Sequence, residues 1–195
     1  MSDPVEGAVL RELLEQIAAG EASALAALYE RTVDRLNALV QRIVRIEADA
    51  DDVLSEVYRQ VWERPRQYTA ERGPVLAWLY VIARTRSIDL VRRRRVLVDI
   101  EVTPLGAMDA SVVSERVEAP ELLAALQAGT ALHAALRDLS AEQRQMLELS
   151  FFRGLSHLEI SEQTGLALGT VKSHIRRGQQ AMRKALEARG ISDAG

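Results

Sequence analysis

The sequence contains no cysteine among its 195 residues, which excludes disulfide bonds and thiolate metal sites. Aromatic residues make up only 4% of the chain, so a core must be built mainly from Leu, Ala, Val and Ile. The three histidines, His133, His157 and His174, show no H-x-x-x-H spacing, which argues against a zinc site. No apolar run approaches the roughly 18 residues that span a bilayer, and no secretory signal pattern is present. We expect a cytoplasmic protein without metal, cofactor or membrane insertion.

The net charge of −3 hides a strong segregation of charge along the chain. Residues 84–95 contain six arginines and a single acid, Asp89. Residues 46–58 contain five acids and no base, and residues 96–121 contain six acids and only Arg116. This alternation predicts separate surfaces for partners of opposite charge.

Hydrophobic periodicity predicts an all-α fold of two small helical domains, residues 1–95 and 121–195. The helices expected in the first domain are residues 10–18, a long helix capped by Ser23, a helix capped by Asp49 that ends at Arg64, and a helix from Pro74 to Arg95. The inward positions of the third helix are predicted to be Val53, Leu54, Val57, Val61 and Trp62. Trp78 of the fourth helix is also expected in the core.

Residues 96–120 interrupt this pattern, because they contain Pro104, Gly106 and Pro120, many acids and no helical period. They are predicted to form a flexible acidic linker. Helices are expected to resume at residues 121–138 and 140–152.

The C-terminal domain is predicted to contain a helix-turn-helix. Ser140 with Gln143, and Ser156 with Glu159, have the S-x-x-E/Q spacing of a capping box, and Gly165 provides a turn. In the helix that follows, one face is apolar and consists of Val171, Ile175, Met182 and Leu186. The opposite face consists of Ser173, Arg176, Arg177, Gln180 and Lys184. No acid occurs between Gly165 and Leu186, so this face suits the DNA major groove better than it suits a merely solvated helix.

Three segments carry a resemblance to a known family. Residues 49–58 (DADDVLSEVY) and 77–95 (AWLYVIARTRSIDLVRRRR) resemble the core-binding "DAEDLVQE" and promoter-melting "AWLYRIARN…IDxxRRR" segments of the second conserved region of sigma-70 family transcription initiation factors. Residues 169–173 (GTVKS) resemble the "GTVKSR" recognition helix of the fourth region. Residues 22–186 are covered and nothing matches the first or third region, so the chain resembles the extracytoplasmic-function (ECF, group IV) class.

The resemblance implies a non-enzymatic subunit that binds core RNA polymerase through its largest catalytic subunits, binds promoter DNA, and is held inactive by an anti-sigma factor. The implied polymerase-binding residues are Asp49, Asp52, Val53, Glu56 and Gln60. The residues implied in −10 recognition and melting are Tyr68, Tyr80, Arg84, Thr85, Arg86, Arg92, Arg93, Arg94 and Arg95. The residues implied in −35 recognition are Thr170, Lys172, Ser173, His174, Arg176 and Arg177.

The chain departs from the family pattern at three places. Thr85 stands where the family often has Asn, and His174 where it often has Arg, so both bear on promoter preference. The dipeptide Ala167–Leu168 replaces the usual small polar residue or Pro, which predicts a weak cap for the recognition helix.

These features are also compatible with other interpretations. The acids of residues 49–52 also favour a helix N-terminus without any partner. The helix-turn-helix alone fits an ordinary regulator of the response-regulator type, which would not need residues 78–95 or the acidic segment. The acids Asp49, Asp51, Asp52 and Glu56 could in principle hold Mg²⁺ in an enzyme, but no phosphate-binding glycine loop accompanies them.

Overall fold

The structure, a computed structural model, describes residues 4–102 and 136–188, and all regular elements in these two ranges are helices. This agrees with the predicted all-α class. The chain divides into two compact units, with the boundary inside helix α4 after Leu90. Each unit is described by itself below.

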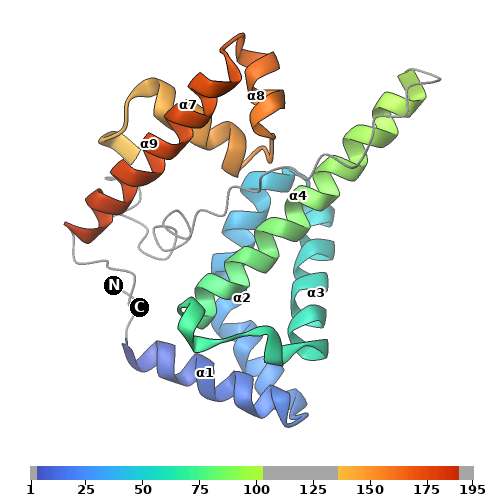
Figure 1. Ribbon diagram of the computed structural model, residues 1–195. Helices are drawn as coiled ribbons and strands as arrows, with labels where there is room; N and C mark the ends of the chain where they lie inside the picture. The colour runs from blue at the N-terminus through green and yellow to red at the C-terminus, as the bar shows by residue number, and fades with distance from the viewer. Residues whose placement is uncertain (1–3, 103–135, 189–195) are drawn as a thin grey trace. The chain divides into compact units, whose positions relative to one another are not determined.

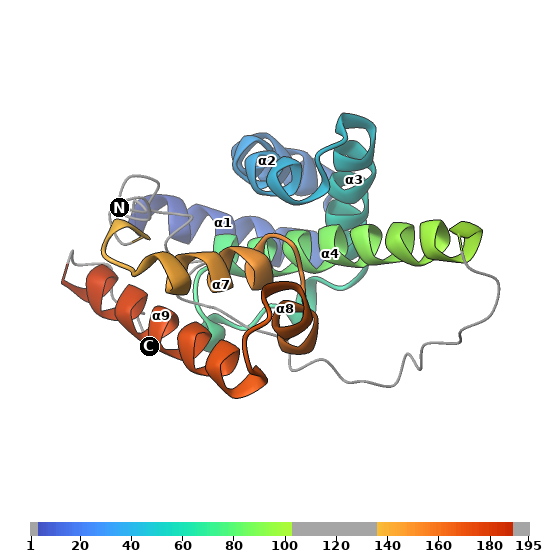
Figure 2. The same ribbon diagram turned by 90° about the horizontal axis from the view of Figure 1, so that it is seen from above.

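The N-terminal unit is built from α1 (Pro4–Ala18), α2 (Ala22–Val44), α3 (Glu47–Glu63) and the part of α4 (Val75–Val102) that ends at Leu90. Two 3₁₀ turns, η1 (Pro65–Gln67) and η2 (Ala70–Arg72), lie between α3 and α4. Helix α2 packs against both α1 and α3, and α4 crosses this group (Figures 1 and 2). The core consists of aliphatic side chains with no solvent exposure, among them Leu28, Leu36, Val40, Val57, Val61 and Leu79. Their helical spacing places one apolar stripe of each helix inside.

A pair of buried hydroxyl groups joins α2 to α3. The Thr32 hydroxyl donates to the carbonyl oxygen of Leu28 at 2.7 Å, and its oxygen lies 2.8 Å from the Tyr58 hydroxyl. Because the single Thr32 proton is used in the first bond, the Tyr58 hydroxyl is the donor in the second. Burial raises the pKa of Tyr58 to about 12.

Helix α1 is an integral part of this unit. Its side chains Leu10, Leu14 and Ile17 are 2%, 4% and 2% exposed. Glu6 pairs with the guanidinium of Arg35 on α2, and the hydrogen bond from Arg35 holds the pKa of this carboxyl below its usual value. The helix also contacts η1, so it supports the start of the connection formed by residues 65–73, which we call the Tyr68 loop.

Two of the predicted helix caps are wrong. Helix α2 begins at Ala22 after Glu21, so Ser23 lies inside its first turn. Helix α3 begins at Glu47, because Arg45 ends α2 in the left-handed conformation and Ile46 is extended. Asp49 therefore lies in the first helical turn instead of capping it.

Two further predictions about this unit are corrected. Trp62, predicted inward, is 39% exposed, because it follows the buried Val61 and lies off the apolar stripe. Helix α4 continues to Val102, so residues 96–102 are helical and do not belong to an irregular linker. The remainder of the predicted linker and most of the predicted helix 121–138 lie outside the described residues.

The C-terminal unit contains α7 (Ala141–Phe151), α8 (His157–Thr164) and α9 (Leu168–Glu187). Helix α9 packs against both α7 and α8. Gly178 makes the close approach of α7 and α9 possible, because a Cβ atom there would lie 3.0 Å from Leu147 Cδ1. The core of this unit includes Met146, Phe151, Ile160, Val171 and Met182.

Replacing Tyr58 by Phe should lower the free energy of unfolding of the N-terminal unit by about 0.5–1.5 kcal/mol, because one buried hydrogen bond is lost. Urea unfolding followed by tryptophan fluorescence measures this, since Trp62 and Trp78 both lie in that unit. Tyr29→Phe is the control, because the Tyr29 side chain is 46% exposed and should tolerate the change.

The same pair predicts a pH dependence. The pKa of Tyr58 is higher in the folded state, about 12, than its ordinary value of 10.0, so its stabilisation is complete below pH 10 and is lost as the pH rises through 12. The wild type should therefore lose its advantage over Tyr58→Phe across this interval. An unchanged difference between the two proteins at high pH would contradict the assigned burial of the phenol.

Candidate functional site

Two capping boxes fix the starts of α7 and α8. The Ser140 hydroxyl accepts a hydrogen bond from the backbone N–H of Gln143 at 3.2 Å. The Gln143 side-chain oxygen accepts one from the backbone N–H of Ser140 at 3.1 Å. Ser156 and Glu159 make the same reciprocal pair at 3.2 Å and 2.6 Å. Both predicted capping boxes are thus confirmed, and each satisfies backbone N–H groups that a helix start leaves open.

The turn between α8 and α9 depends on Gly165. Its φ of 71° is left-handed, and its amide donates to the carbonyl oxygen of Ser161 at 2.9 Å. The Ser161 hydroxyl then donates to the carbonyl oxygen of Leu166 at 2.6 Å. The carbonyl oxygen of Ala167 accepts the amides of Thr170 and Val171, so α9 begins at Leu168 although no polar side chain caps it.

Helix α9 has one buried and one exposed face, as predicted. Val171, Ile175 and Met182 are 0%, 3% and 1% exposed, whereas the side chain of Leu186 lies outside the described residues. The exposed polar side chains are Lys172, Arg176, Arg177, Gln180, Arg183 and Lys184. Thr170, Ser173 and His174 are partly buried at the edge of this face.

Two contacts order this edge. Arg177 donates to the Ser173 carbonyl oxygen at 3.3 Å and to the Ser173 hydroxyl at 2.6 Å, so this guanidinium is held along the helix. His174 Nδ1 is buried and has no hydrogen-bond partner within the described ranges. His174 also helps to lower the pKa of Glu142 at the start of α7, after the hydrogen bonds that this carboxyl receives. The imidazole is therefore turned partly toward α7.

The second group of predicted site residues lies on α3. Asp52 is exposed, and Glu56 and Gln60 are half-buried. Asp49 and Val53, also predicted to bind a partner, are only 5% and 4% exposed. These two share the buried face of α3, so they present little surface to a partner.

The third group lies on the loop and on α4. Tyr68 is half-buried; its hydroxyl donates to the carbonyl oxygen of Gly73 at 3.1 Å, and its ring centroid lies 5.7 Å from that of the half-buried Trp78. Burial raises the pKa of Tyr68. Tyr80, predicted to meet unstacked bases, is 3% exposed and belongs to the core, since it lies one helical turn after the buried Leu76.

The arginines of α4 differ in exposure. Arg84, Arg86 and Arg92 are half-buried, as is Thr85, whereas Arg93 and Arg94 are exposed; the side chain of Arg95 lies outside the described residues. Arg86 does not extend into solvent. It turns back toward α3, the helix that carries the predicted polymerase-binding residues.

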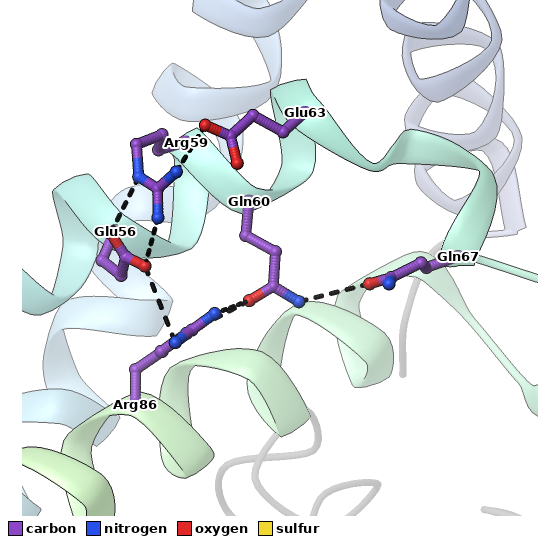
Figure 3. A network of polar contacts seen from close by, with 6 residues as sticks. All are labelled: Glu56, Arg59, Gln60, Glu63, Gln67 and Arg86. Atoms are coloured by element: carbon purple, nitrogen blue, oxygen red, sulfur yellow. Dashed lines mark hydrogen bonds and ion pairs between the residues drawn. The ribbon is translucent and has the colours of Figure 1, made fainter.

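A polar network joins α3, η1 and α4 (Figure 3). Arg86 Nε and a terminal nitrogen of Arg86 donate to Gln60 Oε1 at 3.1 Å and 2.6 Å, and its other terminal nitrogen lies 3.6 Å from Glu56 Oε1. Gln60 Nε2 donates to Gln67 Oε1 at 3.4 Å. Arg59 Nε donates to Glu56 at 2.9 Å, and Arg59 also pairs with Glu63.

Sequence reasoning missed this network. The pairs of Arg59 with Glu56 and Glu63 follow the i−3 and i+4 spacing of helix ion pairs, so they were open to prediction. The contact of Arg86 with Gln60 joins residues 26 positions apart, and no local pattern indicates it.

Within residues 4–102 and 136–188, no three His, Asp or Glu side chains come together as a metal-binding group. Among the helices of the same two ranges, none has the length and apolarity needed to cross a membrane.

Comparison with known proteins agrees with this arrangement of two helical units. The family model described as Sigma-70 region 2 matches residues 28–96, and the one described as Sigma-70, region 4 matches residues 129–182. An ECF RNA polymerase sigma factor SigK of Mycobacterium ulcerans is 33% identical over 92% of this chain and 94% of its own length. The chain belongs to the sigma-70 family. Its relatives place it in the ECF class, so it directs transcription initiation by RNA polymerase as a non-catalytic subunit.

Further sigma factors resemble this chain. The SigK proteins of Mycolicibacterium vanbaalenii and Mycobacterium tuberculosis are 31% and 30% identical over 94% and 91% of it, and over 92% and 94% of their own lengths. Among solved structures, CnrH in complex with the cytosolic domain of CnrY has a TM-score of 0.42 and 23% identity over 92% of this chain and 98% of that chain. RpoE of Bartonella quintana, solved with the anti-sigma factor NepR, has a TM-score of 0.36 and 21% identity over 82% of this chain and 94% of that chain.

Replacing Gly165 by Ala should weaken the helix-turn-helix by about 1 kcal/mol or more, because an Ala side chain is strained at a φ of 71°. Gly169→Ala is the matched control: this glycine is helical, a Cβ there meets no atom within 4 Å, and helix propensity favours Ala by up to about 1 kcal/mol. Hydrogen exchange of the α8 and α9 amides measures both changes. Equal protection in the two variants would contradict the role assigned to the turn.

Proposed function

We propose that this sigma factor brings core RNA polymerase to its promoters through three surfaces. Helix α9 binds the −35 element, the Tyr68 loop and α4 bind and open the −10 element, and the exposed face of α3 binds core polymerase. The observation that carries the proposal is the arrangement of α9, whose cations lie opposite a fully buried apolar stripe and next to a capped helix and a glycine turn.

Recognition of the −35 element is assigned to the exposed face of α9, with Thr170, Lys172, Ser173, His174, Arg176 and Arg177. Cations on this face can contact phosphates, and Arg or Lys can donate to the O6 and N7 atoms of guanine in the major groove. His174 is partly turned toward α7, so we assign it a lesser part than Lys172 and Arg176.

Binding of the −10 strand is assigned to Tyr68, Arg84, Thr85, Arg92, Arg93, Arg94 and Arg95. Unstacked bases are held by aromatic faces beside a cationic track. Tyr68 and Trp78 supply two neighbouring rings with an interplanar angle of 56°, and both are partly accessible. Tyr80 is left out of this surface because it lies in the core.

Binding of core polymerase is assigned to Asp52, Glu56 and Gln60 on α3. These three residues follow the i, i+4 spacing, so they form one row along α3 beside its buried stripe, and their carboxylate and amide groups are at least partly accessible. Acids on this face attract a basic partner surface, which favours association and its correct orientation. The partner in this proposal is formed by the largest catalytic subunits of RNA polymerase.

An anti-sigma factor is proposed as a further partner. Two solved structures that resemble this chain carry CnrY or the anti-sigma factor NepR. Large apolar side chains are exposed on both units of this chain, among them Val81, Leu158 and Leu168 at 43%, 51% and 39%. Because its polymerase and its promoters lie in the cytoplasm, we propose that the protein acts there.

Run-off transcription tests the function as a whole. Core polymerase purified from the source bacterium is combined with fragments of its genome, with and without this protein. New start sites that share spaced −35 and −10 elements are expected only when the protein is present. Binding to duplex DNA with no new transcript would instead favour an ordinary regulator.

Replacing both Arg176 and Arg177 by Ala should reduce promoter-specific transcription at least tenfold and leave core binding intact, because phosphate and base contacts are lost only from α9. Duplex binding and run-off transcription measure the first effect, and co-sedimentation with core measures the second. The control is Arg31→Ala with Arg42→Ala on α2, which removes the same charge from exposed positions elsewhere. Equal losses from both pairs would argue against a specific role for α9.

Replacing both Asp52 and Glu56 by Lys should have the opposite result. Core affinity should fall at least tenfold, because the new lysines then face the basic surface proposed for core polymerase. Binding of −35 duplex DNA should persist. Fluorescence anisotropy of the labelled protein titrated with core measures the affinity. Glu12→Lys with Glu15→Lys on α1 provides a control with the same change in charge. Unchanged core affinity of the α3 variant would remove this face from the proposal.

A further inference from the structure

Arg86 extends from α4 toward α3 and makes polar contacts with two of its residues. Three of its nitrogen atoms have partners there: Nε and one terminal nitrogen donate to Gln60 Oε1, and the other lies 3.6 Å from Glu56 Oε1 (Figure 3). The side chains of Arg86 and Glu56 are each only 34% exposed. The flat guanidinium fork therefore has its donors directed at the proposed polymerase-binding face.

This contact fixes the orientation of the Gln60 amide. Arginine can only donate, so the group that faces Arg86 has to be the Gln60 oxygen. The Gln60 nitrogen is then turned toward η1, where it donates to Gln67 Oε1 at 3.4 Å. Without Arg86, the Gln60 amide could rotate so that its oxygen and nitrogen exchange places. A partner would then meet the oxygen acceptor in some molecules and the nitrogen donor in others.

Arg86 also acts on Glu56. The Glu56 carboxylate accepts a hydrogen bond from Arg59 Nε at 2.9 Å and also lies beside Arg86. Cations on two helices, α3 and α4, therefore limit its movement. Arg59 is itself shared with Glu63 on the same helix. Arg86 is therefore the contact that ties Glu56 to α4.

We propose that Arg86 is a positioning residue for core polymerase binding, which acts through Gln60 and Glu56, and that it does not contact −10 DNA. The inference rests on the proposed role of the α3 face. Arg86 thus supports polymerase binding, whereas the other arginines of α4, Arg84 and Arg92 to Arg95, are assigned to the −10 strand. Its physical basis is preorganisation: polar groups already held in place lose less conformational freedom when the partner binds.

Core affinity of five variants tests the proposal: Arg86→Ala, Arg86→Lys, Gln60→Ala, the double variant Arg86→Ala with Gln60→Ala, and the control Arg31→Ala. Arg31 lies on α2, is exposed and belongs to none of the proposed binding surfaces. We expect Arg86→Ala to weaken core binding about five- to tenfold, because the Gln60 and Glu56 side chains then lose more conformational freedom when core binds. Arg86→Lys should recover part of the loss, since it donates without the two-pronged geometry. Arg31→Ala should leave core affinity unchanged.

The double variant separates positioning from a general loss of structure. If Arg86 acts through Gln60, the loss in the double variant should be clearly smaller than the product of the two single losses. A fully multiplicative loss would overturn the proposal. So would a loss of core affinity in Arg86→Ala that merely follows a lowered unfolding temperature.

A second measurement separates positioning from DNA contact. Binding of a single-stranded −10 oligonucleotide, taken from a promoter mapped by run-off transcription, is measured with saturated holoenzyme. Arg86→Ala should bind it as the wild type does. Weaker strand binding with unchanged core affinity would make Arg86 a DNA contact and overturn the proposal.

The variant Asp52→Lys distinguishes failure of this inference from failure of the proposed function. Asp52 is exposed on the same face and takes no part in the network of Figure 3. If Asp52→Lys weakens core binding and Arg86→Ala does not, only the role of Arg86 is wrong. If neither affects core binding, the α3 face is not the polymerase site and both proposals fall.

Discussion

Burial of one apolar face on each helix is the constraint on which both proposed binding faces depend. On α9, Val171 and Ile175 are 0% and 3% exposed, and the cations Lys172 and Arg176 each follow one of them by a single position. A helix that buries the first pair has to present the second. With no cysteine and few aromatic residues, this aliphatic burial supplies most of the stabilisation. A change that rotated α9 would therefore remove its core contacts and its basic face together.

Sequence patterns correctly predicted those features that depend on interactions between residues close together in the sequence. The capping boxes at Ser140 and Ser156 need only a side chain and an amide three residues apart, and both form. The cap assigned to Ser23 failed because α2 already begins at Ala22, after the extended Glu21. The cap assigned to Asp49 failed because α3 begins at Glu47, just after Arg45 adopts a left-handed conformation at φ 66°. That conformation is unusual for a residue other than glycine, and nothing in the neighbouring sequence indicates it.

Two features of the candidate site were not predicted from the sequence. Asp49, Val53 and Tyr80 lie on buried faces, and the helical period alone could have shown this, because Asp49 and Val53 precede Val57 by eight and four positions. The resemblance to a family motif favoured them and outweighed that geometry. The contact of Arg86 with Gln60 differs in kind. It depends on how α4 crosses α3, so it follows from tertiary packing and not from any pattern within one helix.

The arginines of this chain are not equivalent sources of attraction for DNA. Arg35 is paired with Glu6, and Arg59 is shared between two carboxylates, so each positive charge is offset where it arises. Arg144 instead donates to the carbonyl oxygens of residues 136 and 139. At physiological salt, screening weakens the interaction between exposed charges that are more than about 8 Å apart. A phosphate is therefore attracted or repelled mainly by the balance of positive and negative side chains close to it. Between Gly165 and Leu186 no acid offsets the cations. A net charge of −3 is therefore compatible with DNA binding, because the pairing of each cation, and not their total, decides which face can attract phosphate.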